Sequence, residues 1–252
     1  AQALVRPAYA SPADTWQINT MGTINVLESL RQLNQSCVAV FITSDKCYDN
    51  VEWVWGYRET DALGGPDPYS ASKGAAEFAI RSYIRSFFPA DGKVRIGVGR
   101  AGNVIGGGDW AQDRVVPDCM RAWSSGETVS LRNPLATRPW QHVLEPLSAY
   151  LNLSIALREE PKLHGEPFNF GPNAQQNNTV GELVSAMSQH WNKVRWNDIS
   201  IQHDGLYESS LLKLNCDKAL HHLGWRPTWD FEDTVRETTL WYKRFYENPS
   251  ES

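Results

Sequence analysis

The stretch VAVFITSDKCYDN, residues 38–50, decides the fold class of this 252-residue chain. A short run of apolar and β-branched residues at 38–43 predicts a buried strand. The run ends in Ser44, Asp45 and Lys46, so a hydroxyl, an acid and a base stand together where the strand stops. In α/β folds, ligands bind at the carboxyl ends of parallel strands. We therefore expect an α/β protein with a site at this edge of a sheet.

The segments around this strand alternate between helix and strand patterns. Helices are predicted at 20–33 and 70–88, and a second strand at 94–98. This order is typical of βαβ units and a parallel sheet. The loop AGNVIGGGDW, residues 101–110, has no helical or strand period. Further elements are expected as helices at 115–125, 142–158 and 231–247, a strand at 167–170, a capping box at Thr179 and Glu182, and a short helix capped by Asp217 and closed by Gly224.

Composition excludes several classes of function. The net charge is -5 without a long run of one sign, which argues against nucleic acid as a partner because phosphate binding needs a concentrated basic face. No stretch approaches the roughly 20 apolar residues of a membrane span, and we find no secretory signal, so a cytoplasmic protein is expected. The spacing of the four cysteines fits no metal site, and free thiols are expected.

The motif PYSASK, residues 68–73, contains a candidate base. Tyr69 and Lys73 are four residues apart, which places them on one face of a helix. A tyrosine has a pKa of about 10, and a nearby ammonium lowers it. The pair is therefore suited to taking a proton from an alcohol. By itself the motif fits equally a surface tyrosine beside a solvated lysine, but its place between two strands favours the functional interpretation.

These motifs together resemble the extended short-chain dehydrogenase/reductase family. The likeness runs through NTMGTINVLE (19–28), VFITSD (40–45), PYSASK (68–73) and RAGNVIGGGDW (100–110). It implies a Rossmann-like parallel sheet flanked by helices, with NAD bound through Tyr69 and Lys73, and a smaller C-terminal α/β substrate domain. Residues 1–103 with 141–171 would form the NAD-binding domain, and 104–140 with 172–252 the sugar-nucleotide domain. Members of the family usually form homodimers or higher homo-oligomers.

Within the family, TSDKCYDN (43–50), EWVWGYRE (52–59) and GNVIGGGDW (102–110) most resemble the CDP-glucose 4,6-dehydratases, which serve deoxysugar biosynthesis for bacterial O-antigens. The resemblance implies NAD-dependent dehydration of CDP-glucose to CDP-4-keto-6-deoxyglucose. Tyr69 would deprotonate the sugar 4-hydroxyl, Ser44 would hydrogen-bond the 4-oxygen, and Asp45 would protonate the departing 6-hydroxyl. Lys46 would be the C5 base, or would orient Asp45 or steady an enolate. Without this context, Asp45 and Lys46 could equally be a solvated ion pair.

The resemblance also implies residues on the substrate side. Asn103 would touch the sugar diphosphate, Arg114 and Arg138 would reach phosphates, and Arg132 would lie near the base; for each arginine a solvated surface charge is the alternative. Two further positions have structural alternatives: Asn19 orders the catalytic helix or is a plain N-cap, and His142 is a cap or core residue. Tyr207 and Glu208 are possible substrate contacts.

The family's Gly-x-x-Gly-x-x-Gly turn for the NAD pyrophosphate does not occur in these 252 residues. We therefore expect either a fragment of a longer enzyme or a natural short form that has lost tight NAD binding. Three rival functions stay open: a dTDP- or GDP-sugar 4,6-dehydratase, a sugar-nucleotide epimerase, which would have no use for Asp45 and Lys46, and a non-catalytic sugar-nucleotide binding module.

Overall fold

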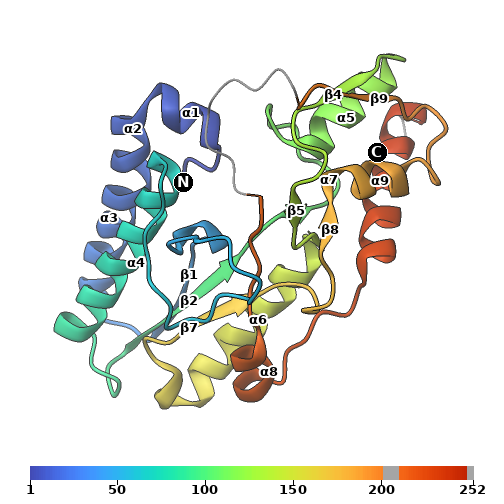
Figure 1. The fold of residues 1–252 in the computed structure, drawn as a ribbon. Helices are drawn as coiled ribbons and strands as arrows, with labels where there is room; N and C mark the ends of the chain where they lie inside the picture. Colours follow the sequence, from blue (N-terminus) through green and yellow to red (C-terminus); the bar gives the residue numbers. More distant parts are fainter. Residues whose placement is uncertain (201–209, 249–252) are drawn as a thin grey trace.

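A computed structural model describes residues 1–200 and 210–248 and places a three-stranded parallel sheet at the centre of the protein (Figure 1). The strands are β1 (Cys37–Ile42), β2 (Val94–Ala101) and β7 (Pro167–Phe170), in the order β1-β2-β7. Helix α4 (Pro68–Phe87) connects β1 to β2, and α6 (Leu144–Glu159) lies between β2 and β7 in the chain. The predicted α/β class and parallel sheet are confirmed.

Side chains alternate along β2, and this alternation explains how helices cover both faces of the sheet. One face carries branched side chains that join the core beneath α3 (Gly22–Arg31) and α4: Val94, Ile96 and Val98. The other face carries Gly97 and Gly99. A Cβ at these positions would lie 2.7 Å from Leu157 and 2.8 Å from Tyr150, both on α6. The helix α6 therefore packs directly on the β2 backbone because β2 has no side chains there.

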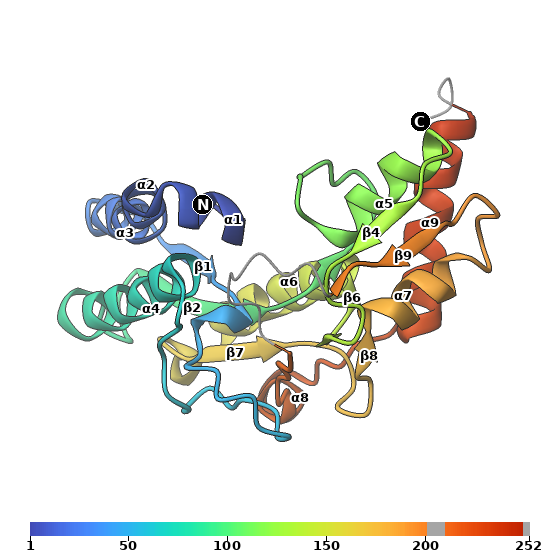
Figure 2. The same cartoon turned by 45° about the horizontal axis from the view of Figure 1, so that its top comes forward.

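The smaller part of the chain gathers beyond one end of the sheet (Figure 2). It contains α5 (Val115–Ser124), α7 (Val180–Met187) and α9 (Phe231–Glu247), with the parallel pair β4 (Val129–Leu131) and β9 (Trp196–Asp198). A second core forms between these elements, centred on the fully buried Trp123 and Trp191. Two short strand pairs lie between the central sheet and this smaller part. They are β3 (Val104–Ile105) with β6 (Gln141–His142), and β5 (Thr137–Arg138) with β8 (Asn178–Thr179).

Several local predictions are confirmed and others are wrong. The capping box at Thr179 and the left-handed Gly224 (φ 62°) are present as predicted. Asp217 is not a cap: it is the first residue of α8 (Asp217–Leu223), and its carboxylate accepts a bond from the Asn215 amide (2.9 Å). The Gly-rich loop contains the short strand β3, which becomes regular by pairing with β6.

The N-terminal helices α1 (Val5–Ala10) and α2 (Pro12–Trp16) were not expected from the sequence. They lead into a π-helical turn, Gln17–Met21, that continues into α3. Figure 1 shows α1 to α4 gathered on one side of the sheet.

All four cysteines are free. No helix in the described ranges is long and apolar enough to cross a membrane, and no cluster of three or more His, Cys, Asp or Glu residues in those ranges could hold a metal ion.

Candidate active site

The catalytic helix α4 begins at a strong cap that fixes its first turn. Asp67 Oδ1 accepts bonds from the backbone amides of Tyr69 (2.9 Å) and Ser70 (3.0 Å), and Oδ2 accepts one from the Ser70 hydroxyl (2.5 Å). Pro68 occupies the first helical position, where its fixed φ suits the helix. Tyr69 and Lys73 follow one turn apart, and both are buried. The predicted placement of this pair at the start of a helix is confirmed.

The end of β1 brings Ser44 and Asp45 to the same place. The Ser44 hydroxyl donates to Asp45 Oδ1 (3.0 Å) and accepts from the Lys46 backbone amide (3.2 Å). A side-chain hydrogen bond also joins Ser44 to Tyr69. One hydroxyl therefore connects the candidate acid to the candidate base, across 25 residues of sequence.

The Asp45 carboxyl is buried and only partly hydrogen-bonded. Its side chain is 2% exposed, and Oδ2 has no hydrogen-bond partner among the described residues. Burial raises the pKa of Asp45 above its ordinary value, while the charges of Lys46 and Arg138 act in the opposite direction. Gly102, just beyond β2, makes room for the carboxyl, because a Cβ there would lie 1.8 Å from Oδ2.

The Tyr69 hydroxyl behaves differently from the sequence expectation. Burial raises the pKa of Tyr69 to about 12, although the bond from Ser44 and the charge of Arg114 lower it. The prediction of a lowered Tyr69 pKa is therefore wrong for the protein alone, because burial outweighs the neighbouring charges and helical spacing does not reveal burial.

Lys73 is placed to hold a polar ligand. Its side chain is 7% exposed, and we find no hydrogen bond or ion pair from its ammonium to any described residue. Burial lowers the pKa of Lys73, and the charge of Glu77 opposes that shift. A buried ammonium with unused donors beside Tyr69 fits the ribose hydroxyls of a dinucleotide, so the residues present suit the nicotinamide end of NAD.

A cavity of about 720 Å³ opens over the end of β1 and the first turn of α4; Lys73 is not among the residues that line it. Ser44, Asp45, Lys46 and Tyr69 line its floor, and the four substrate-side candidates predicted from the sequence line it too: Asn103, Arg114, Arg132 and Arg138.

The three cavity arginines that were predicted from the sequence differ in their surroundings. Arg138 is buried, and its charge acts on Asp45. Arg114 is paired with Asp109 (3.0 Å), and Arg132 lies 3.7 Å from Asp113; both are partly exposed. A cavity that brings these arginines together above an acid and a base suits a diphosphate attached to a sugar.

Sequence reasoning missed two residues of the cavity wall, Arg6 and Asp113. Arg6 Nε lies 3.6 Å from Asp113 Oδ1, so α1 reaches the same carboxylate as Arg132. Asp113 has a φ of 61°, in the left-handed region that Asp tolerates better than most residues. Neither residue stands in a motif, and only the fold brings them together across more than a hundred positions.

Asn19 and His142 have the structural roles expected of them. Asn19 lies in the π-helical turn, and its amide donates to Ser72 Oγ of the catalytic helix (2.9 Å). It orders that helix and is not an N-cap. His142 is buried, packs on the Trp229 ring at 4.6 Å and accepts a bond from the Leu144 amide at the start of α6. Tyr207 and Glu208 lie outside the described residues.

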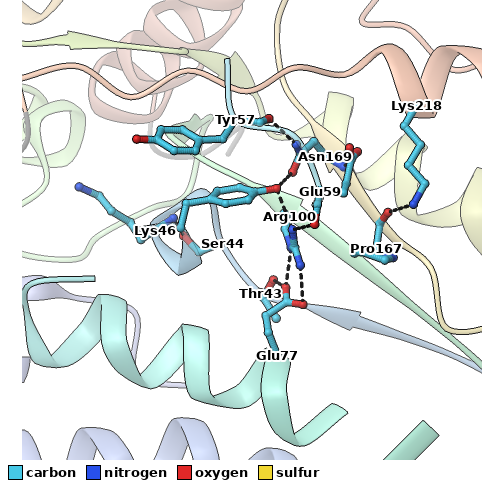
Figure 3. A network of polar contacts seen from close by, with 11 residues as sticks. Thr43, Ser44, Lys46, Tyr57, Glu59, Glu77, Arg100, Pro167, Asn169 and Lys218 are labelled. Carbon is cyan, nitrogen blue, oxygen red and sulfur yellow. Dashed lines mark hydrogen bonds and ion pairs between the residues drawn. The ribbon is translucent and has the colours of Figure 1, made fainter. Parts of the chain in front are cut away.

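A buried polar network supports the site from below (Figure 3). Arg100 forms a two-bond ion pair with Glu77 (2.8 and 2.9 Å) and donates to the Tyr48 hydroxyl (2.8 Å). Tyr48 in turn donates to Asn169 Oδ1 (2.7 Å) on β7. The network therefore links α4, β2 and β7 beneath the carboxyl ends of the strands. No sequence motif pointed to it.

A tyrosine and lysine on a helix beside the carboxyl ends of a parallel sheet, under a cavity lined by arginines, define a short-chain dehydrogenase/reductase that acts on a sugar nucleotide. The chain belongs to the GDP-mannose 4,6 dehydratase family, whose model matches residues 1–238. It is 46% identical to a CDP-glucose 4,6-dehydratase of Salmonella typhimurium over 96% of this chain and 68% of that protein. It is 26% identical to a dTDP-glucose 4,6-dehydratase of Streptomyces antibioticus, over 96% of this chain and 68% of the relative.

Solved structures have the same fold. A UDP-glucose 4-epimerase of Stenotrophomonas maltophila with bound NAD superposes with a TM-score of 0.84 at 19% identity, over 98% of this chain and 75% of the other. A dTDP-glucose 4,6-dehydratase of Bacillus anthracis in complex with NAD gives a TM-score of 0.74 at 22% identity, over 92% and 69%. The family uses NAD.

Proposed function

We propose that this protein is an NAD-dependent lyase that dehydrates CDP-glucose to CDP-4-keto-6-deoxyglucose. The observation that carries the proposal is the buried Asp45 carboxyl with a raised pKa beside Tyr69, in a chain 46% identical to a CDP-glucose 4,6-dehydratase. An acid at this position has a task in losing water and none in epimerisation, so it favours dehydratase over epimerase among proteins of this fold.

Tyr69 and Ser44 act at the sugar C4. Tyr69 takes the proton of the 4-hydroxyl. The Ser44 hydroxyl, which donates to Asp45 in the protein alone, would turn to donate to the 4-oxygen as it becomes a carbonyl. Bound NAD would supply the hydride chemistry, taking a hydride from C4 and returning it to C6. Lys73 would hold the nicotinamide ribose through its unused ammonium donors.

Asp45 and Lys46 act at C6 and C5. The 4-keto group acidifies the C5 proton, which Lys46 removes from its place on the cavity wall. Asp45 gives its proton to the 6-hydroxyl, and water leaves, so C5 and C6 become doubly bonded. When the hydride returns to C6, the Lys46 ammonium gives a proton back to C5. Burial raises the pKa of Asp45, and a raised pKa suits this step, because a general acid must hold its proton until the leaving group takes it.

The diphosphate of the substrate would lie among Asn103, Arg114, Arg132 and Arg138, because charge-assisted bonds from arginine suit phosphate oxygens. On this assignment, residues 1–103 with 141–171 hold the cofactor, and 104–140 with 172–252 hold the sugar nucleotide.

We also infer a homodimer formed through α3 and α4. These helices expose apolar side chains on their outer surfaces, among them Val26, Phe78 and Phe87. Sedimentation of the purified protein tests this: a monomer at micromolar concentration contradicts it.

Turnover of sugar nucleotides tests the proposal. The product of the complete reading frame, loaded with NAD, is incubated separately with CDP-glucose, dTDP-glucose and GDP-mannose. We expect a 4-keto product that has lost water from CDP-glucose. Turnover of only the dTDP or GDP sugar would overturn the CDP assignment, and binding of CDP-glucose without any turnover would identify a binding module.

A further inference from the structure

The strand β1 loses its backbone support just before the catalytic residues. The amide of Thr43 donates to the Gly99 carbonyl (2.9 Å), continuing the ladder between β1 and β2. Ser44 then leaves the sheet in an extended conformation, and Asp45 opens a 3-10 turn. Since Asp45 Oδ2 has no partner among the described residues, the position of this carboxyl depends strongly on where the strand end is held.

The Thr43 side chain fixes the position of the end of β1. Its hydroxyl donates to Glu77 Oε1 (2.5 Å), and the same carboxylate accepts both bonds of Arg100 (2.8 and 2.9 Å). Glu77 and Arg100 are only 5% and 3% exposed. Figure 3 shows the Thr43 hydroxyl directed at this pair, on the opposite side of the strand end from Lys46.

We propose that Thr43 is a positioning residue for the dehydration: its hydroxyl ties the end of β1 to the Glu77–Arg100 pair and so fixes Ser44 and Asp45 for reaction. The inference rests on the proposed function, because it assigns Thr43 to the step in which Asp45 gives its proton to the leaving hydroxyl. Thr43 also lines the cavity, but its hydroxyl is bonded to Glu77, so this assignment gives it no chemical step of its own.

The Glu77–Arg100 pair is well placed to serve as the fixed point. Glu77 lies one helical turn beyond Lys73 on α4, and its charge opposes the effect of burial on the pKa of Lys73. Arg100 lies two residues before Gly102, which accommodates the Asp45 carboxyl. Asp45 follows β1, Gly102 follows β2, and Lys73 lies on α4. These three segments therefore meet at the Glu77–Arg100 ion pair.

The test replaces Thr43 while leaving Glu77 paired. Thr43→Val keeps the shape and removes the hydroxyl, so Glu77 retains both bonds from Arg100. We expect kcat to fall by roughly 10- to 100-fold, the effect of a small misplacement of a catalytic group, with KM little changed. Thr43→Ser restores the hydroxyl and should restore most of kcat. The matched control is Thr238→Val on α9, a fully buried threonine whose hydroxyl has no partner among the described residues; it should keep wild-type kcat.

A double variant separates positioning from a general structural role. In an Asp45→Asn enzyme the acid is already absent, so adding Thr43→Val should slow the remaining turnover much less than it slows the wild type. An equal loss in both backgrounds, a Thr43→Ser enzyme as slow as Thr43→Val, or an unaffected Thr43→Val enzyme would each overturn the proposal. All rates are measured on whichever sugar nucleotide the wild type turns over, so a failed CDP assignment is recognised separately.

Discussion

Replacing Gly102 by alanine tests whether the Asp45 carboxyl must lie where the structure places it. The added methyl would stand 1.8 Å from Asp45 Oδ2 and 2.1 Å from Cγ. Ordinary contact begins near 3.4 Å, so the carboxyl oxygen must withdraw by about 1.6 Å. Because a displacement of about 1 Å can reduce turnover about 100-fold, we expect kcat to fall at least that far. Overpacking should also lower the free energy of unfolding by about 1 to 3 kcal/mol.

The assay for Gly102→Ala is kcat and KM with CDP-glucose, together with chemical denaturation to confirm that the variant is folded at the assay temperature. Gly22→Ala is the control: Gly22 opens α3, and a Cβ there meets nothing within 4 Å. It should keep wild-type kcat and gain up to about 1 kcal/mol of stability. A folded Gly102→Ala enzyme with wild-type kcat would refute the placement of Asp45 as the acid.

Three further predictions concern stability and the substrate loop. Arg100→Met leaves the buried Glu77 carboxylate without its ion-pair partner and should lower the free energy of unfolding by about 3 to 5 kcal/mol. A loss below about 1 kcal/mol in urea denaturation would contradict the burial of the pair. Asp45→Asn should stabilise the protein at neutral pH. The pKa of Asp45 is raised in the folded state. The wild type therefore loses stability as the pH rises from the ordinary Asp pKa of about 3.9 through the raised pKa. The gain in unfolding free energy should therefore vanish in acid, and a gain independent of pH contradicts it. Tyr242→Phe removes both bonds between the Tyr242 hydroxyl and the Asp109 backbone (2.7 and 3.0 Å), which hold the Gly-rich loop; KM for CDP-glucose should rise by about tenfold with kcat unchanged, whereas an unchanged KM excludes this role.

The parts of the fold that follow from short-range patterns could be predicted from the sequence. The run ending at Ser44 gave β1, and the periodicity of 231–247 predicted α9 at its observed bounds. Helices α1 and α2 were missed because prolines usually read as helix breakers. Here Pro7 lies within the first turn of α1 and Pro12 begins α2, and proline is tolerated at both places.

The residues of the candidate site fall into the same two groups: those that a local sequence pattern reveals, and those that only the fold brings together. Tyr69 and Lys73 were found because a four-residue spacing on a helix is visible in sequence. The contact of Gly102 with Asp45, the meeting of Arg6 with Asp113, and the bond from Thr43 to Glu77 all join distant segments. Burial is likewise invisible in a local pattern, which is why the direction of the Tyr69 pKa shift was predicted wrongly.

The most direct test of the account follows the hydrogens of the product. The NAD-loaded enzyme from the complete reading frame turns over CDP-glucose carrying deuterium at C4, in ordinary water, and the product is analysed by NMR and mass spectrometry. The account predicts a CDP-4-keto-6-deoxy sugar with the deuterium at C6 and a solvent hydrogen at C5. A C4 epimer that retains its 6-hydroxyl, or unchanged substrate, would contradict it.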